Sequence, residues 1–229
     1  MRPFCLLLAL AAPVACAGRT PVLVTTAGDD TVVAKGSSYR WTFDQTPPVP
    51  GTGELAVPRE RTFVGVLGRW GIAEDADAPS LPRVYRQSGR LGPTDAPRVI
   101  VSDLVFHDLT LRVSCRPDAG ITGEGCGLVF DATDSDDYFA VRADTLQGRL
   151  TLIHVRAGDE REIATASAQV VPHLWHSITV RTRAQRVVVD WDGERLLDAV
   201  DWSRTGGKIG LTTSADAVTS FDDLEAMAD

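Results

Sequence analysis

No apolar run in this 229-residue chain is long enough to cross a bilayer as a helix, which needs about 20 residues. The one candidate run, residues 4–12, is short, follows the positive Arg2 and precedes the small residues Ala-Cys-Ala at 15–17. These features predict a secretory signal that is removed after Ala17. The sequence therefore indicates an extracytoplasmic protein, either periplasmic, secreted or at the cell surface, without a transmembrane segment.

A second processing route would use Cys16. Residues 14–16 resemble the end of a lipoprotein signal, in which the cysteine becomes the lipidated first residue. Pro13 occupies a position where that pattern normally has leucine, so cleavage after Ala17 and a lipid anchor at Cys16 both stay open. Residues 18–34 then predict a tether or edge segment that leads into a single domain over residues 35–229.

Excess positive charge is also missing. The chain has 23 Lys and Arg against 31 Asp and Glu, which gives a formal net charge of −8. Nucleic-acid affinity depends on clustered Lys and Arg that neutralise phosphates, whereas the arginines here are scattered among acids. The composition excludes a phosphate-tracking surface, and a hydrophobic content of 44% argues against a disordered chain.

Cysteine is scarce, and removal of the signal would leave only Cys115 and Cys126 of the four. An even pair in an exported protein predicts a disulfide. Each cysteine has the parity of the apolar residues in its own run, which are Leu109, Leu111, Val113, Leu128 and Phe130. A bridge would join two strands across the glycine-rich loop 116–125 and contribute about 3 kcal/mol.

Helical periodicity is absent apart from two short stretches, residues 54–60 and 201–204, and Pro58 weakens the first. Alternating or β-branched runs separated by turn residues predict strands instead. They cover residues 39–43, 64–72, 83–87, 98–101, 104–115, 127–131, 138–143, 150–155, 175–182, 186–191, 195–200, 208–213 and 218–224. This pattern predicts an all-β fold of two packed antiparallel sheets, a jelly-roll β-sandwich, with a barrel as the second possibility.

Several motifs follow one another in a recognisable order. They are residues 67–70 (Leu-Gly-Arg-Trp), 84–87 (Val-Tyr-Arg-Gln), 127–130 (Gly-Leu-Val-Phe), 137–143 (Asp-Tyr-Phe-Ala-Val-Arg-Ala), 174–180, 189–193, 208–213 and 221–224. In these motifs the chain resembles the concanavalin A-like lectin/glucanase superfamily, in the secreted laminin-G-like branch related to the domain named for 3-keto-disaccharide hydrolases. The resemblance covers about residues 39–224 and implies the sandwich fold more than an activity, because most matched residues have a role in folding.

Catalytic motifs of that superfamily are missing. A retaining glycosidase would carry paired carboxylates in an E-x-D-x-x-E arrangement, and no such motif occurs. A Gly-x-Ser-x-Gly nucleophile elbow is also absent. No catalytic residue is therefore assigned, and the sequence leans against an enzyme; if the protein is one, we expect a glycoside hydrolase or lyase.

An acidic loop offers a metal site as one interpretation. Asp131, Asp134 and Asp136, with Asp137 beside them, could supply oxygen ligands to a hard cation such as Ca²⁺. The alternative is a solvated loop, and the resemblance implies a basic residue at the position of Asp131. No other cofactor is expected.

Two histidines, His173 and His176, do not form a zinc pair, because residues three apart on a strand point to opposite faces. His176 shares the parity of Ile178 and Val180. We therefore expect His176 to lie at the border of the core with its hydrogen bonds satisfied.

Polar and aromatic side chains that point away from the core give the main prediction of a binding site. If Phe139 and Val141 face inward, Tyr138 and Arg142 face outward by alternation. Aromatic rings stack on the C–H faces of sugars, and charged side chains bond their hydroxyls. We predict ligand binding on one sheet face by Tyr138, Arg142, His154, Trp175 and Asp190. The alternative is an ordinary half-exposed sheet.

Three functions follow from these observations. The first is an exported, lectin-like sandwich that binds a glycan or oligosaccharide without catalysis. The second is a glycoside-processing hydrolase of the kind that the resemblance implies. The third is a laminin-G-like module that binds protein or mediates adhesion.

Overall fold

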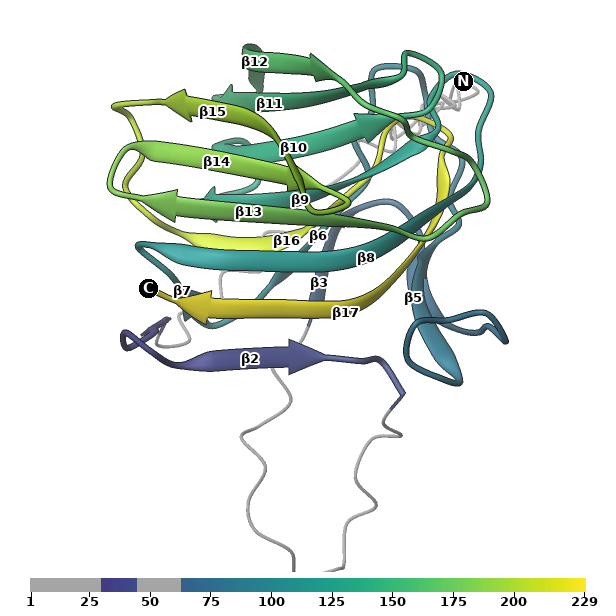
Figure 1. Cartoon of the computed structure of the whole chain (residues 1–229), viewed down its shortest axis with the longest axis horizontal. Coiled ribbons are helices and arrows are strands. Elements are labelled where there is room, and N and C mark those ends of the chain that lie inside the picture. Colours follow the sequence, from purple (N-terminus) through teal and green to yellow (C-terminus); the bar gives the residue numbers. More distant parts are fainter. Residues whose placement is uncertain (1–29, 45–62) are drawn as a thin grey trace, which may run out of the picture.

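The computed structural model describes residues 30–44 and 63–229, and every regular element in these ranges is a strand (Figure 1). No helix in this part of the chain is long and apolar enough to cross a membrane. The predicted signal peptide, the lipid anchor at Cys16 and the short helix over residues 54–60 lie outside the described residues.

One layer is a seven-stranded antiparallel sheet. Its strands, in spatial order, are β12 (Asp159–Ser167), β11 (Arg149–Arg156), β10 (Tyr138–Asp144), β9 (Gly125–Ala132), β16 (Lys208–Thr212), β6 (Arg98–Val101) and β3 (Phe63–Leu67).

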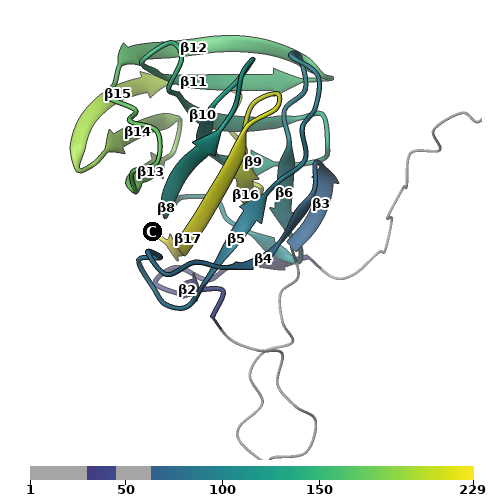
Figure 2. The same ribbon diagram turned by 90° about the vertical axis from the view of Figure 1, so that its right-hand side faces the viewer.

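The second layer is an eight-stranded antiparallel sheet. Its order is β15 (Glu194–Val200), β14 (Arg186–Trp191), β13 (His176–Arg183), β8 (Leu109–Ala119), β17 (Val218–Ala228), β5 (Arg83–Gln87) and β4 (Trp70–Glu74), and β2 (Ser38–Trp41) also pairs with β17. The outer strands β12 and β15 of the two sheets lie close together at one margin, as Figures 1 and 2 show. The predicted antiparallel β-sandwich is therefore confirmed.

The core between the sheets is built by alternate residues of each strand. The inward rows of β8 and β9 contain Leu109, Leu111, Val113, Cys115, Cys126, Leu128 and Phe130, all of which are buried. The predicted disulfide is present between Cys115 and Cys126, whose strands belong to different sheets. The bridge therefore links the two layers inside the core.

The elements differ from the prediction most clearly in four places. Residues 64–72 form two strands, because Gly68, with φ of 103°, turns the chain between β3 and β4. Residues 104–115 divide into β7 (Leu104–Val105) and β8 at a bend over 107–108. The edge strand β12 is absent from the prediction, because it begins with four exposed charged residues and Ile163 is its only large apolar side chain. Residues 201–204 form a turn and no helix.

Part of the predicted N-terminal edge segment packs on the sandwich. Strand β1 (Thr31–Val32) pairs in parallel with β7, and Val33 is buried in the main core. Asp30 forms an ion pair with Lys208 at 3.0 Å.

A buried carboxylate organises the loop that leads to Cys126. Asp216 accepts hydrogen bonds from the backbone N–H groups of Ile121, Thr122 and Gly123 and from the Thr122 hydroxyl. Hydrogen bonds of this kind stabilise the charged form. They hold the pKa of Asp216 well below its ordinary value.

We expect Asp216→Asn to lower the free energy of unfolding by about 1–2 kcal/mol at pH 7, because an amide oxygen accepts these hydrogen bonds more weakly. The folded-state pKa of Asp216 lies below the unfolded value, so its stabilisation is complete above about pH 4 and is lost as the pH falls through the folded-state pKa. Urea unfolding of both proteins at pH 7 and pH 2.5 checks this. A deficit that does not shrink at pH 2.5 would contradict it.

Candidate functional site

The solvent-facing side of the seven-stranded sheet has a floor of small and apolar residues. Strand register aligns Ile153, Ala140, Val129, Gly210 and Ile100 in one row across β11, β10, β9, β16 and β6. Three of them, Ile153, Ala140 and Val129, are at most 1% exposed, although they face away from the core between the sheets. Other side chains on this side must therefore cover the row.

Arg142 covers one part of the row. It projects from β10 on one side of Ala140, and its Nη1 donates to the Glu160 carboxylate at 2.9 Å. The register places Glu160 of β12 beside Val155, on the far side of the row. The Arg142 side chain therefore crosses above the floor to reach its partner.

The Arg98 side chain, which projects from β6, also crosses above the floor of small and apolar residues, from the same side as Arg142. Its Nη2 donates to the carbonyl of Ser135 at 2.6 Å and lies 3.7 Å from the Asp136 carboxylate. Its guanidinium group lies over the Tyr138 ring, 5.0 Å from the ring centre. Together with Tyr138, Arg142 and Glu160, it forms a surface that we call the arginine face.

The arginine face contains buried donors without partners. Nε of Arg98 and both Nε and Nη2 of Arg142 make no hydrogen bond among the described residues, and they are three of the six buried side-chain atoms in that condition. Because Nη1 of Arg142 is occupied by Glu160, the Nε and Nη2 groups leave one edge of the guanidinium unpaired. That edge can hold two oxygens side by side.

An unpaired buried donor costs about 1–3 kcal/mol relative to a hydrogen-bonded one. The free edge of Arg142 therefore favours a partner that presents two neighbouring oxygens. A carboxylate and a pair of adjacent sugar hydroxyls both have that geometry.

The structure separates the five residues predicted to bind ligand on one face. Tyr138 and Arg142 lie on the arginine face as expected, although Tyr138 is only 3% exposed and the Arg98 guanidinium lies over its ring. The group that faces solvent at this position is consequently the Arg98 guanidinium, which covers the face of the Tyr138 ring on which a sugar could stack. Their role in ligand binding stays a prediction.

His154 lies at the end of the sandwich, in the inward row of β11. Its ring stacks on Phe139 with the ring centres 4.1 Å apart. Nδ1 lies 3.4 Å from the Ser203 hydroxyl, and Nε2 lies 3.5 Å from the Asp137 carboxylate. His154 therefore does not contribute to the arginine face.

Asp190 belongs to the eight-stranded sheet, and Trp175 lies in the loop that leads into it. Trp175 immediately precedes β13, and the Arg116 guanidinium lies 4.9 Å from its ring centre. Asp190 on β14 accepts a hydrogen bond from Arg181 at 2.5 Å. The interpretation that all five residues share one face is wrong, because alternation gives inward or outward orientation and does not identify the sheet.

The acidic loop does not gather the three carboxylates of the predicted metal site. The Asp131 side chain is 1% exposed and pairs with Arg204 at 2.6 Å. Asp134 accepts a hydrogen bond from the backbone N–H of Asp136 at 2.6 Å. Over residues 30–44 and 63–229, no group of three His, Cys, Asp or Glu side chains is placed to hold a metal ion.

His176 lies at the border of the core, as expected. Its Nδ1 lies 2.7 Å from the Asp192 carboxylate, and its Nε2 lies 3.0 Å from both backbone polar atoms of Val171. The ring stacks on Trp191 with the ring centres 4.7 Å apart. This histidine therefore has a structural role.

Sequence reasoning missed two members of the arginine face, Arg98 and Glu160. Arg98 alternates with the buried Val99 and Val101, so the parity argument applied to Tyr138 and Arg142 would have placed it outward. Glu160 lies on β12, the strand without an apolar pattern.

No family model and no curated protein matches the chain. Among solved structures, it is similar to the carbohydrate-binding module CBM66 from Bacillus subtilis, with a TM-score of 0.61 and 18% identity over 72% of this chain and 95% of that one. It is also similar to a Bacillus subtilis protein of unknown function with a galectin-like fold, with a TM-score of 0.59 and 14% identity over 85% and 97%. A third similar structure is the Crh5 transglycosylase, with a TM-score of 0.54 and 12% identity over 85% and 86%. At these identities the likeness establishes the fold, a β-sandwich of the concanavalin A-like and galectin-like type.

Proposed function

We propose that this protein is an exported, lectin-like sandwich that binds a glycan on the arginine face and does not act on it chemically. The observation that carries the proposal is the unpaired Nε and Nη2 edge of Arg142, together with the unpaired Nε of Arg98 on the same sheet face. Both side chains are held in place at their far ends by Glu160 and Ser135. The unpaired nitrogens are buried in the free protein, so a ligand reaches them by displacing the side chains that cover them, and it then pairs donors that are otherwise without partners.

The mixture of groups on the arginine face suits sugar hydroxyls, each of which both donates and accepts hydrogen bonds. The guanidinium groups of Arg98 and Arg142 donate. The Glu160 carboxylate, whose side chain is 48% exposed, can accept from a hydroxyl in addition to its bond with Arg142. Adjacent donors and acceptors of this kind match a pair of neighbouring hydroxyls on one sugar ring.

Binding is proposed in preference to hydrolysis on the basis of the carboxylates. The sequence has no E-x-D-x-x-E motif. The two carboxylates at the arginine face, Glu160 and Asp136, each lie beside an arginine, whereas hydrolysis uses two carboxyl groups flanking one glycosidic bond. Of the similar structures, one is described as a carbohydrate-binding module and another as a transglycosylase, so both possibilities enter the test.

Location outside the cytoplasm is part of the proposal. The Cys115–Cys126 disulfide is of the kind that persists in oxidising compartments. The N-terminal pattern of residues 1–17 supports the same location, with lipidation at Cys16 as the alternative to cleavage after Ala17.

A glycan array probed with the protein lacking residues 1–17 tests the proposal. We expect wild-type protein to bind a restricted set of glycans and Arg142→Gln to bind them at least about 10-fold more weakly, since a hydrogen bond to a charged group contributes about 1.5–3 kcal/mol. Arg186→Gln is the matched control, because it removes an exposed arginine from the eight-stranded sheet. Equal binding by wild type and Arg142→Gln would contradict the assigned face.

The same glycans, incubated with the protein and analysed for products, separate binding from catalysis. Release of a shortened or modified sugar would favour the glycoside hydrolase. Capture of a protein ligand without any glycan binding would favour the laminin-G-like module.

A further inference from the structure

The segment that joins β15 to β16 presents a tryptophan to solvent. Trp202 is 83% exposed, whereas the other four tryptophans of the chain, Trp41, Trp70, Trp175 and Trp191, are half-buried or buried. Tryptophan rings contribute strongly to binding when a ligand covers them. The exposed ring is therefore a candidate contact for a ligand.

The backbone is anchored on both sides of Trp202. Asp201, which directly precedes it, is buried and binds the Arg161 guanidinium at 2.5 Å. Arg204, two residues after it, is buried in the ion pair with Asp131. The turn that carries the ring is thus part of the fold, so little backbone entropy is lost when a ligand contacts the ring.

Two short contacts connect this turn to the arginine face. The Ser203 hydroxyl lies 3.4 Å from Nδ1 of His154, and Nε2 of His154 lies 3.5 Å from the Asp137 carboxylate. Asp137 directly precedes Tyr138, a member of the arginine face. A row of polar side chains therefore leads from the arginine face to the residue beside Trp202.

Strand β12 adjoins the same two regions. Its consecutive residues Glu160 and Arg161 point to opposite sides of the strand. Glu160 binds Arg142 at 2.9 Å, whereas Arg161 binds Asp201. The arginine face and the Trp202 turn are therefore held by neighbouring positions of one strand.

We propose that Trp202 stacks on a further sugar unit of the glycan that the arginine face binds, so that the ligand is an oligosaccharide chain and not a single terminal sugar. This inference rests on the function proposed above. The C–H faces of sugar rings pack on aromatic rings. The unpaired donors of the arginine face are buried, whereas Trp202 is open to solvent, so a sugar unit stacks there without displacing other side chains.

Polar groups at the turn can bond the hydroxyls of the stacked unit. Arg161, whose side chain is 61% exposed, has N–H donors besides the one that binds Asp201. Ser203 is exposed, and its hydroxyl oxygen, which donates to Asp201, can also accept a hydrogen bond. An aromatic ring with a donor and an acceptor nearby suits a sugar.

Acidic side chains at this end of the sandwich argue against an anionic membrane as the partner of Trp202. Asp134, Asp136 and Asp159 are exposed on two turns that contact each other, because the backbone N–H of Gly158 donates to the carbonyl of Asp136 at 3.0 Å. Anionic lipids attract clusters of Lys and Arg. A neutral glycan is not repelled by these carboxylates.

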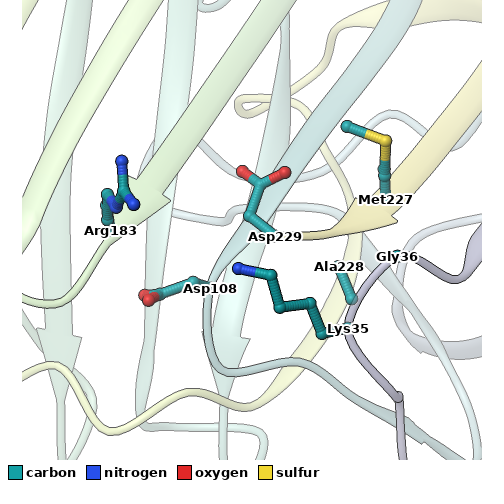
Figure 3. A pocket seen from close by; sticks show the side chains of 7 residues that line it. All are labelled: Lys35, Gly36, Asp108, Arg183, Met227, Ala228 and Asp229. Carbon is teal, nitrogen blue, oxygen red and sulfur yellow. The ribbon is translucent and has the colours of Figure 1, made fainter.

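The hollow in Figure 3 does not provide an equivalent stacking site. It has a volume of about 630 Å³, and its charged lining residues are two cations, Lys35 and Arg183, and two acids, Asp108 and Asp229. These charges offset one another, and none of the seven lining residues is aromatic. The hollow therefore lacks the ring that Trp202 offers to a sugar.

Isothermal titration calorimetry with glycans of two lengths tests the inference. The probes are cello-, laminari-, manno- and xylo-oligosaccharides, each as the disaccharide and the hexasaccharide. We expect at least one hexasaccharide to bind wild-type protein at least about 5-fold more tightly than its disaccharide, because the longer chain reaches Trp202 as well as the arginine face.

Trp202→Ala should bind that hexasaccharide at least about 5-fold more weakly than wild type and should bind the disaccharide equally well. Trp202→Phe keeps an aromatic ring and should retain most of the gain with length. Arg142→Gln should bind both lengths more weakly, because both use the arginine face. The matched control is Ile121→Ala, which removes a side chain that is 77% exposed, between β8 and β9 at the opposite end of the sandwich.

The variants separate failure of this inference from failure of the proposed function. Unchanged hexasaccharide binding by Trp202→Ala, beside weakened binding by Arg142→Gln, would overturn the inference and leave the arginine face in place. Weakened binding by Trp202→Ala alone would instead contradict the proposed function and make Trp202 a separate site.

Three further results would also overturn the inference. They are equal loss in Trp202→Ala and Ile121→Ala, absence of binding to every hexasaccharide, and self-association of wild-type protein that Trp202→Ala abolishes while sugar binding is unaffected. The last result would assign the ring to a contact between protein molecules.

Discussion

Arg204→Ala is expected to lower the free energy of unfolding by about 3–5 kcal/mol, because it leaves a charge buried without a partner. Nε of Arg204 lies 2.6 Å from the Asp131 carboxylate, and both side chains are 1% exposed. Arg204 also donates to the carbonyls of His107 and Ala184, so one guanidinium connects three segments of the chain. Burial raises the pKa of Asp131, while the hydrogen bonds and charge of Arg204 oppose that increase.

Urea denaturation of wild type and Arg204→Ala measures this effect. Arg186→Ala is the control, because it breaks an Arg–Asp pair in which both partners are exposed and should have little effect on stability. The double variant Asp131→Asn/Arg204→Ala should recover part of the loss, since it removes the unpaired charge. Equal stability of Arg204→Ala and Arg186→Ala would show that the buried pair does not hold the loops together.

Loss of the Cys115–Cys126 disulfide is expected to lower the free energy of unfolding by about 2–4 kcal/mol. The bridge closes a loop with a sequence separation of 11 and connects β8 to β9 across the core. It therefore restricts the conformations that are open to the unfolded chain. The same loop is held in the folded state by Asp216.

Unfolding of wild type with and without dithiothreitol, beside the double variant Cys115→Ala/Cys126→Ala, measures the contribution of the bridge. We expect the reductant to lower the stability of wild type to that of the double variant and to leave the double variant unchanged. A wild type that unfolds at the same urea concentration under both conditions would contradict this expectation.

The fold could be predicted largely from alternation. In β10, for example, Phe139 and Val141 alternate with outward residues, and the structure places both in the core. The disulfide was predicted from the two cysteines that remain after removal of the signal, and the same parity supported it. Strand β12 could not be found in this way, because it begins with four charged residues and its apolar residues are mostly alanines. Its place in the sheet is set by backbone pairing with β11.

The candidate site was only half predictable, because local alternation does not tell which sheet a strand joins. Tyr138 and Arg142 were placed on the correct side of β10, whereas Asp190 proved to lie on the other sheet and Trp175 in the loop that leads into it. In the sequence, Asp131 has no basic residue near it and was therefore interpreted as a metal ligand. Its partner in the structure, Arg204, is 73 residues away. Pairing over such a distance is set by the assembled fold and is invisible in a local pattern.

The most direct test of glycan binding on the arginine face is a titration that follows the arginine Nε–Hε resonances by NMR, using a glycan selected on the array. We predict that the signals of Arg98 and Arg142, whose Nε groups are unpaired, shift as glycan is added. The Nε–Hε signals of Arg116 and Arg204, which already donate to Asp118 and Asp131, should stay in place. Glycan binding that leaves Arg98 and Arg142 unshifted, or that shifts only arginines of the eight-stranded sheet, would contradict the assigned site.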